Sequence, residues 1–292
     1  MDLRQIASAV SSRTRAILPV HVFGRPCDMV AILDVARRLG IHVIEDACEA
    51  IGATCYGRQV GTFGDLGVFA FYPNKQMTTG EGGMVVTDNA EYATLCRSWR
   101  NQGRGEADSW LQHERLGFNY RLPEMNCALG LAQLTRLSDI LTKRAAAART
   151  YSEILSDSIP EVLPPAKAQP GMTVSWFVYV VRLSEEFDRS ERDAILAHLT
   201  ARGIGCSNYF TPIHLQPFYR TRFGYARGDF PVTERVAEHT IALPFFTDIQ
   251  PDQIREVCSA LRQAISAVRA ERSALVPVGV ACEPESHASW IS

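Results

Sequence analysis

One lysine in this sequence lies where it could form a covalent imine with a carbonyl compound. Lys75 follows the apolar run 66–71 after a turn that contains Pro73, and the glycine-rich stretch 80–83 comes soon after it. A nucleophilic lysine must be held on a fixed backbone and partly removed from water, so that its amine can be neutral. Glycines let the backbone approach a bulky ligand closely. The segment predicts a reactive lysine beside a ligand, although most lysines in turns are simply solvated, and Lys75 taken alone could be one of these.

A carboxylate at the end of an earlier strand indicates which ligand. The apolar, β-branched run that begins at Ile41 leads into Glu45 and Asp46. In open parallel sheets, ligands bind outside the carboxyl ends of the strands, so Asp46 and Lys75 should face the same crevice. A lysine for the aldehyde and an aspartate for the pyridine nitrogen are what pyridoxal 5′-phosphate (PLP) requires. Asp46 could instead only cap the segment that follows it.

Six segments, in their order along the chain, carry a resemblance to a known family. They are the Lys75 segment (71–83) and the sequences PVHVFG (19–24), IEDA (44–47), GDLG (64–67), LGFNYR (116–121) and PIH (212–214). The chain resembles, from Asp2 to about Ile265, the DegT/DnrJ/EryC1/StrS family of fold-type I PLP enzymes, which are mostly sugar aminotransferases.

The resemblance implies both a fold and a reaction. The fold is α/β, of the PLP-dependent transferase type I, with an incomplete, mostly parallel sheet covered by helices on both faces and a smaller α+β C-terminal domain. The reaction is the transfer of an amino group from an amino-acid donor, such as glutamate, to a keto group of a nucleotide-linked sugar, as in polysaccharide biosynthesis.

The resemblance also assigns roles to four residues. It implies that Lys75 is bonded to PLP and moves the proton during the reaction, that Asp46 pairs with the pyridine nitrogen, and that Glu49 lies near the ring. Asn119 would reach the cofactor phosphate of a neighbouring subunit, which implies a homodimer. As alternatives, Glu49 could be a plain surface carboxylate and Asn119 a turn or capping residue.

Four further residues in the resembling segments have two possible roles. Tyr120 and Arg121 could bind anionic groups of the substrate or cofactor, whereas Arg121 could equally form a structural ion pair. His21 and His214 resemble recurrent positions near the active site. A lone histidine, however, more often packs or forms structural hydrogen bonds.

Two features depart from the family pattern. The position five residues before the lysine is often a serine that contacts the phosphate, and here it is Ala70. Family members also carry about a hundred residues ahead of the position of Asp2, including a turn that cradles the phosphate at a helix N-terminus. We therefore expect an N-terminally truncated chain, and a catalytically impaired remnant that only associates with a full-length relative is the alternative to an active enzyme.

The composition excludes several other classes of protein. The formal charge of −2 over 292 residues gives no electrostatic reason to bind nucleic acid or an acidic membrane surface. The eight cysteines show no paired CxxC spacing, so they predict reduced thiols in a cytoplasmic protein and neither a disulfide framework nor a metal site. No apolar run approaches membrane-spanning length.

The order of the expected elements is that of βαβ units followed by an α+β unit. Strands are predicted at 15–23, 42–45, 66–71, 83–87 and 174–183, and helices from Asp28 to Leu39, after Asp88 or Asn89, from Pro123 toward Ile154 with a break near Asp139, at 191–201 and at 252–268. Asp28 is a suitable N-cap, and Gly40 a suitable stop, for the first helix.

These elements divide into two domains. Residues 1–155 are predicted to form the large PLP-binding domain, and the proline-rich stretch 156–171 to connect it to a small C-terminal domain at 172–272. The last residues, 273–292, show no periodicity and are predicted to lack structure.

Overall fold

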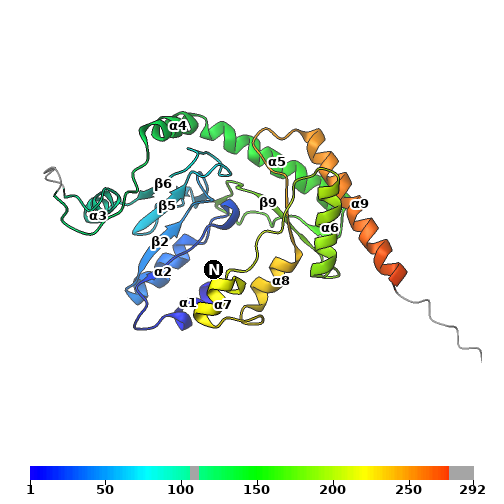
Figure 1. Cartoon of the computed structure of the whole chain (residues 1–292), viewed down its shortest axis with the longest axis horizontal. Coiled ribbons are helices and arrows are strands. Elements are labelled where there is room, and N and C mark those ends of the chain that lie inside the picture. The colour runs from blue at the N-terminus through cyan, green and yellow to red at the C-terminus, as the bar shows by residue number, and fades with distance from the viewer. Residues whose placement is uncertain (106–111, 276–292) are drawn as a thin grey trace, which may run out of the picture.

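The computed structural model describes residues 1–105 and 112–275. In it, one long helix, α5 (Leu137–Ser158), runs between the two halves of the chain (Figure 1), each of which has its own hydrophobic core. The C-terminal half of α5 contributes side chains such as Tyr151 and Leu155 to the second core. Near its start, the Leu141 side chain packs so closely against Gly52 that a Cβ there would collide with it. Residues 106–111 and most of the predicted tail (276–292) lie outside the described residues.

The first sheet has the strand order β1-β2-β5-β6. Strands β1 (Ala16–Ile17), β2 (His42–Asp46) and β5 (Leu66–Ala70) are parallel, and β6 (Gly83–Val86) is antiparallel to β5. This is the mostly parallel sheet that the sequence predicts. Because Asp46 pairs with Val68, the carboxyl ends of β2 and β5 open at the same edge of the sheet.

Helix α2 (Met29–Leu39) has the predicted beginning and end. The Asp28 carboxylate accepts a hydrogen bond from the Ala31 N–H at 3.1 Å, and Gly40 follows the helix in the left-handed region at φ 64°. Its buried face, which includes Ile32, packs with β2 in the first core. The cap and the stop therefore fix where α2 begins and ends, and the apolar face fixes how it packs.

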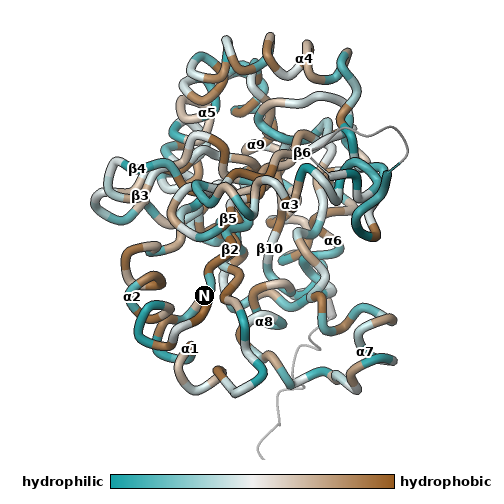
Figure 2. Tube along the Cα trace, turned by 90° about the vertical axis from the view of Figure 1, so that its left-hand side faces the viewer, coloured by the Kyte–Doolittle hydropathy of each residue, from teal (hydrophilic) through white to brown (hydrophobic). Residues whose placement is uncertain are grey.

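Helices and short strands complete the first half of the chain. They are α1 (Leu3–Ala9), the 3-10 turn η1 (Val22–Gly24), β3 (Thr54–Cys55), β4 (Arg58–Gln59), α3 (Ala90–Arg100) and α4 (Glu124–Thr135). Of the two predicted candidates, Asp88 and Asn89, it is Asn89 that caps α3. Helix α4 lies at the edge of the molecule (Figure 2). Several of its apolar side chains are exposed, among them Met125 and Leu131.

The second half packs helices against an antiparallel sheet with the order β10-β9-β7. Its elements are β7 (Val162–Leu163), β8 (Met172–Thr173), β9 (Tyr179–Leu183), α6 (Arg189–Ala201), η2 (Ile213–Leu215), α7 (Pro217–Phe223), α8 (Pro231–His239), β10 (Thr240–Leu243) and α9 (Pro251–Leu275). Helices α6 and α9 lie side by side (Figure 1) and pack with α5 in the second core. This arrangement is the predicted α+β unit.

The structure corrects several predicted boundaries. Only Ala16–Ile17 of the predicted strand 15–23 is a strand, because Pro19 has no N–H to donate and the chain turns at Phe23, whose φ is 61°. The strand predicted at 174–183 begins at Tyr179, since Trp176 also has a positive φ of 53°. The helix break predicted near Asp139 falls three residues earlier, at Arg136.

The predicted tail also begins later than expected. Helix α9 continues to Leu275, so the first three residues of the predicted unstructured segment 273–292 are helical. The predicted division of the chain at 156–171 stays a prediction. Across it, β8 of the later part pairs with β3 of the earlier part, and α5 of the earlier part enters the second core.

Candidate active site

Lys75 lies in the turn after β5 with its side chain directed into the protein. Hydrogen bonds of 3.0 Å close this turn, from Lys75 N–H to the Tyr72 carbonyl and from Thr79 N–H to the Phe71 carbonyl. The side chain is 14% exposed, and its Nζ is 3.7 Å from Glu49 Oε1. The amine is thus held on a fixed backbone and partly removed from water, which are the two conditions that a nucleophilic lysine requires.

Asp46 is the last residue of β2 and is half-buried. Its backbone is fixed on both sides, because its N–H donates to the Pro19 carbonyl at 2.9 Å and its carbonyl accepts from His21 N–H at 3.0 Å. Carboxylate Oδ1 accepts a hydrogen bond from Cys48 N–H at 3.1 Å. Asp46 therefore does cap the segment that follows, through one oxygen, and stands at the strand end predicted to face the ligand.

The charged groups of this region act on one another electrostatically. Burial raises the pKa of Glu49, a hydrogen bond from Phe23 N–H to its Oε2 at 2.8 Å and the nearby Lys75 oppose this, and Asp46 raises the pKa further. Burial, together with Asp46, also raises the pKa of the Cys48 thiol to about 12. The structure thus brings Asp46, Glu49 and Lys75 together, as the sequence predicts.

Two residues that were not predicted from the sequence, Phe177 and Gln76, also belong to the surroundings of Lys75. The centroid of the Phe177 ring is 4.2 Å from Lys75 Nζ. Gln76 is buried, and its Nε2 donates to the Glu49 carbonyl at 2.6 Å and to Ser175 Oγ at 3.0 Å. Phe177 lies about a hundred positions after Lys75, so no local sequence pattern could reveal that the two meet. Gln76 is the next residue after Lys75, and this adjacency could have indicated that it belongs to the site.

Another distant segment reaches Glu49 from the second half of the chain. Burial, and then the Glu49 charge, raise the pKa of Tyr209. The Phe23 ring contacts the rings of Tyr209 and Phe210 at centroid distances of 5.8 and 6.0 Å. The side of the site near Glu49 is therefore aromatic and is built from both halves of the sequence.

His21 belongs to a buried hydrogen-bond network next to Asp46. Its side chain and that of Glu45 are both fully buried, with Nε2 3.1 Å from Glu45 Oε2. Because Nδ1 accepts a hydrogen bond from Cys27 N–H at 3.0 Å, the proton is on Nε2, which donates to Glu45. His21 is thus a structural residue in this geometry. Glu45 was missed as a network centre, although its alternation with Val43 in β2 places it on the buried face.

His214 belongs to a second, separate network. Its Nε2 is 2.9 Å from Glu234 Oε1, and Glu234 also accepts hydrogen bonds from the N–H groups of Gly228 and Phe230. The pair fastens η2 to the start of α8. His214 therefore positions the segment that follows Tyr209 and has no contact with Lys75 among the described interactions.

The structure does not bring Asn119 to the other predicted site residues within one chain. Asn119 is exposed and forms an isolated β-bridge with Asn101, at the end of α3. Arg121 donates to Asn101 Oδ1 at 3.0 Å, and the exposed Tyr120 ring stacks on Phe118 at 5.0 Å. In the described part of the chain, this surface is open to a partner molecule.

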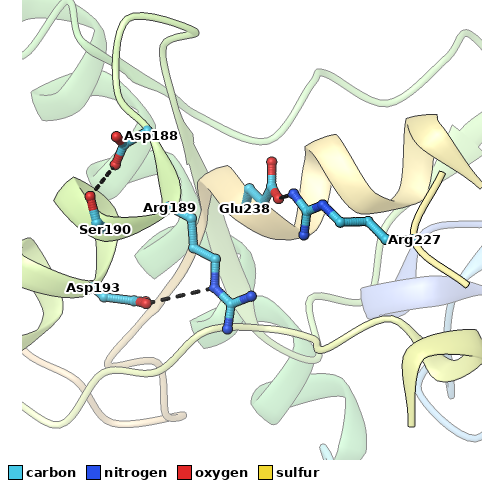
Figure 3. Close-up of a pocket in the computed structure, with 6 residues that line it drawn as sticks. All are labelled: Asp188, Arg189, Ser190, Asp193, Arg227 and Glu238. Atoms are coloured by element: carbon cyan, nitrogen blue, oxygen red, sulfur yellow. Dashed lines mark hydrogen bonds and ion pairs between the residues drawn. The ribbon is translucent and has the colours of Figure 1, made fainter.

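The hollow shown in Figure 3 lies elsewhere, between the start of α6 and α8. Its polar groups are already paired with one another, Asp188 with Ser190, Arg189 with Asp193, and Arg227 with Glu238. It includes none of the predicted site residues. It therefore offers no second candidate for the active site.

Among the described residues, no group of three or more histidine, cysteine, aspartate or glutamate side chains is placed to hold a metal ion. None of the described helices combines the length and apolar character needed to cross a membrane.

Comparison with known proteins decides the family. Residues 1–262 match the DegT/DnrJ/EryC1/StrS aminotransferase family. The chain belongs to this family. It is 37% identical to GDP-perosamine synthase of Caulobacter vibrioides over 265 residues (91% of this chain, 70% of that protein) and 34% identical to the spore coat polysaccharide biosynthesis protein SpsC of Bacillus subtilis over 275 residues (91% and 70%).

Solved structures of the aminotransferase family agree with this assignment. DesV of S. venezuelae, in complex with a ketimine intermediate, superposes with a TM-score of 0.81 at 34% identity, covering 90% of this chain and 68% of DesV. PseC of Helicobacter pylori, an aminotransferase of pseudoaminic acid biosynthesis, gives a TM-score of 0.85 at 25% identity, covering 91% and 71%. The predicted family, fold type I and enzyme class are thereby confirmed.

The enzymes of this family depend on PLP, so the predicted cofactor is also confirmed. The donor set of the site fits the reactive half of that cofactor: a partly desolvated amine for the aldehyde and a carboxylate at an adjacent strand end for the ring nitrogen. For the phosphate, Ala70 offers no hydroxyl at its position. The exposed Asn119 is a hydrogen-bond donor that a second chain could reach.

Proposed function

We propose that this chain transfers an amino group from glutamate to the keto group of a nucleotide-linked sugar. The observation that carries the proposal is the meeting of Lys75, Asp46 and Glu49 at the carboxyl ends of two parallel strands, in a chain of an aminotransferase family. The 37% identity to GDP-perosamine synthase supports a sugar acceptor. The free cysteines among the described residues are compatible with a cytoplasmic enzyme.

Each site residue has a distinct role in this proposal. PLP, when bound, supplies an electron sink that lets an amino group pass from the donor to the acceptor. Lys75 would hold the cofactor covalently through Nζ and would then move the proton through the same atom, as base and as acid. Asp46 keeps the pyridine nitrogen protonated with its carboxylate. Glu49, held by Phe23 N–H, would lie near the ring.

A homodimer is part of the proposal, because Asn119 would bind the cofactor phosphate of the partner. Exposed apolar side chains in the segments that contain and follow Asn119 support it. They belong to the segment 116–120 and to α4, and they are Leu116, Phe118, Tyr120, Met125, Leu129, Leu131 and Leu134. Large apolar side chains exposed in such number are characteristic of an interface between subunits. Sedimentation equilibrium of the purified protein tests this assembly.

The chain has three lysines, Lys75, Lys143 and Lys167, which makes the covalent role easy to test. The purified protein is incubated with PLP, reduced with borohydride, digested and examined by mass spectrometry. We expect a phosphopyridoxyl group on Lys75, and none on Lys143, which is exposed and paired with Asp139 and Asp248. Lys75→Ala should lose the adduct, and the matched variant Lys143→Ala should keep it.

The opposite result would identify the alternative function. Labelling that does not favour Lys75 would mean that the chain does not assemble the site and acts, at most, by associating with a related subunit. If the adduct forms, amino transfer from glutamate is measured with a panel of nucleotide-linked keto sugars. Asp46→Asn should keep the adduct but lower the rate of transfer by about a hundredfold or more, because the carboxylate no longer holds the ring proton.

A further inference from the structure

Arg144 is a buried arginine whose charge meets only neutral groups. It is 4% exposed, and among the described residues its guanidinium makes no ion pair with a carboxylate. By contrast Arg192, equally buried, pairs with Asp193 at 2.8 Å. Burial lowers the pKa of Arg144 to about 10. An unpaired buried charge is costly, so the groups that Arg144 binds are of particular interest.

Arg144 binds two consecutive backbone carbonyls. Its Nε donates to the Trp176 carbonyl at 2.7 Å and its Nη2 to the Phe177 carbonyl at 2.6 Å, while Nη1 reaches Thr247 Oγ1 at 3.3 Å. A planar guanidinium can serve two acceptors at once with fixed geometry, which an ammonium cannot. The segment 175–177 is therefore clamped from the side of α5.

The other side of the same segment forms part of the candidate active site. Ser175 N–H and Phe177 N–H donate to the carbonyls of Gly24 and Phe23, at 3.0 and 3.2 Å. A Cβ at Gly24, which has a φ of 84°, would lie 2.8 Å from the Trp176 nitrogen, so the approach is close. The Phe177 ring, 1% exposed, lies 4.2 Å from Lys75 Nζ. Movement of this segment would move the ring that faces the amine.

We propose that Arg144 is a positioning residue, which holds the carbonyls of Trp176 and Phe177 and thereby fixes the Phe177 ring against the Lys75 amine. The ring shields the amine from water on one side and limits its directions of approach to the cofactor. This inference rests on the proposed function only in taking Lys75 as the residue that binds the cofactor. The contact between ring and amine is a property of the chain itself.

The test measures the reactivity of the Lys75 amine in the protein prepared without PLP. Brief reductive methylation with isotopic formaldehyde, followed by mass spectrometry, gives a labelling rate for Lys75, with Lys143 and Lys167 as internal references. The variants are Arg144→Met, Phe177→Leu and the double variant. Arg149→Met, on the same helix but exposed, is the matched control.

We expect each single variant to raise the Lys75 labelling rate about fivefold, the size of a lost contact between cation and ring. If Arg144 acts through Phe177, the double variant should show no more than the larger single effect. Arg144→Lys should give an intermediate rate, and Arg149→Met no change. Unchanged labelling in Arg144→Met, or effects that multiply in the double variant, would overturn the proposal. If Arg144→Met does not fold, the same comparison is made with Arg144→Lys.

A second readout separates this inference from the proposed function. With PLP added, Arg144→Met and Phe177→Leu should each change the visible absorption of the cofactor and its dissociation constant in parallel with the labelling rates. Coupled labelling rates without a borohydride adduct on Lys75 would refute the proposed function alone. An adduct on Lys75 with uncoupled labelling rates would refute the positioning role alone.

Discussion

Two buried pairs of histidine and glutamate, one in each half of the chain, have the same chemistry but different surroundings. His21 and Glu45 are fully buried, and the Glu45 carboxylate also accepts the N–H groups of Gly61, Phe63 and Gly64 at 2.5–2.7 Å. The second pair, His214 and Glu234, lies near the surface, each side chain 7% exposed, and joins two surface segments.

The difference between the pairs is one of place. Glu45 is adjacent to Asp46 in β2 and points to the opposite face of the strand, so the first pair anchors the strand end that carries Asp46. It also fixes the loop before β5, which packs so closely on the strand that a Cβ at Gly67 of β5 would lie 1.8 Å from the Gly61 carbonyl. The second pair holds a segment that only borders Glu49. Identical side chains thus support the centre of the site in one half and its rim in the other.

The largest effect should come from removing the carboxylate of the first pair. Glu45→Ala leaves His21 Nε2–H and three backbone N–H groups without their acceptor. We expect the free energy of unfolding to fall by about 3–5 kcal/mol, as for other buried pairs that lose one partner. Urea unfolding measures this change, with the exposed Glu153→Ala as control. A decrease no larger than that of the control would show that the network does not stabilise the fold.

Removing the histidine of the same pair should have a smaller effect. His21→Ala deletes one donor to Glu45 and the acceptor of Cys27 N–H, but Glu45 keeps its three backbone donors. We expect a loss of about 2 kcal/mol in urea unfolding. Weaker PLP binding should accompany it, because Asp46 is displaced with β2. Unaltered PLP affinity in a destabilised His21→Ala protein would separate the network from the site.

The pH dependence of stability tests the charge of Glu45. Burial acts to raise its pKa, but hydrogen bonds from His21, Gly64, Gly61 and Phe63 lower it below the ordinary value of 4.5. A carboxylate with a lowered folded pKa stabilises the protein above its unfolded pKa, and this contribution is lost as the pH falls through the folded value. Melting curves should therefore show the advantage of the natural protein over Glu45→Gln shrinking as the pH falls from 5 toward about 3.

The smallest effect should come from the second pair. A hydrogen bond from Gly228 N–H lowers the pKa of Glu234. Burial opposes this, and a hydrogen bond from His214 lowers the pKa further. Glu234→Gln should lower the melting temperature less than Glu45→Gln does, since the pair is near solvent. The borohydride adduct on Lys75 should be unaffected, whereas the KM for the sugar can rise through the Tyr209 segment. Loss of the adduct in Glu234→Gln would show that the second pair, like the first, supports the site around Lys75.

Local chemistry determined what the sequence could reveal. The Asp28 cap, the Gly40 stop and the Asn89 cap depend on neighbours within a few residues, and all three occur as predicted. Asp46 and Lys75 were recognisable because each follows an apolar strand, and parallel strands bring their carboxyl ends together. The boundaries at Phe23 and Trp176 were misjudged, because the positive φ values there follow from packing and not from residue type.

Only the tertiary structure decided which distant groups surround these residues. Phe177 lies 102 positions from Lys75, Tyr209 lies 160 positions from Glu49, and Arg144 lies 33 positions from Phe177. No periodic signal links positions this far apart, since contacts between elements depend on how whole helices and sheets pack. The separation of Asn119 from Lys75 within one chain is likewise a matter of packing. The sequence alone determined the chemistry available at β2 and β5, and the packing of the two cores determined what encloses it.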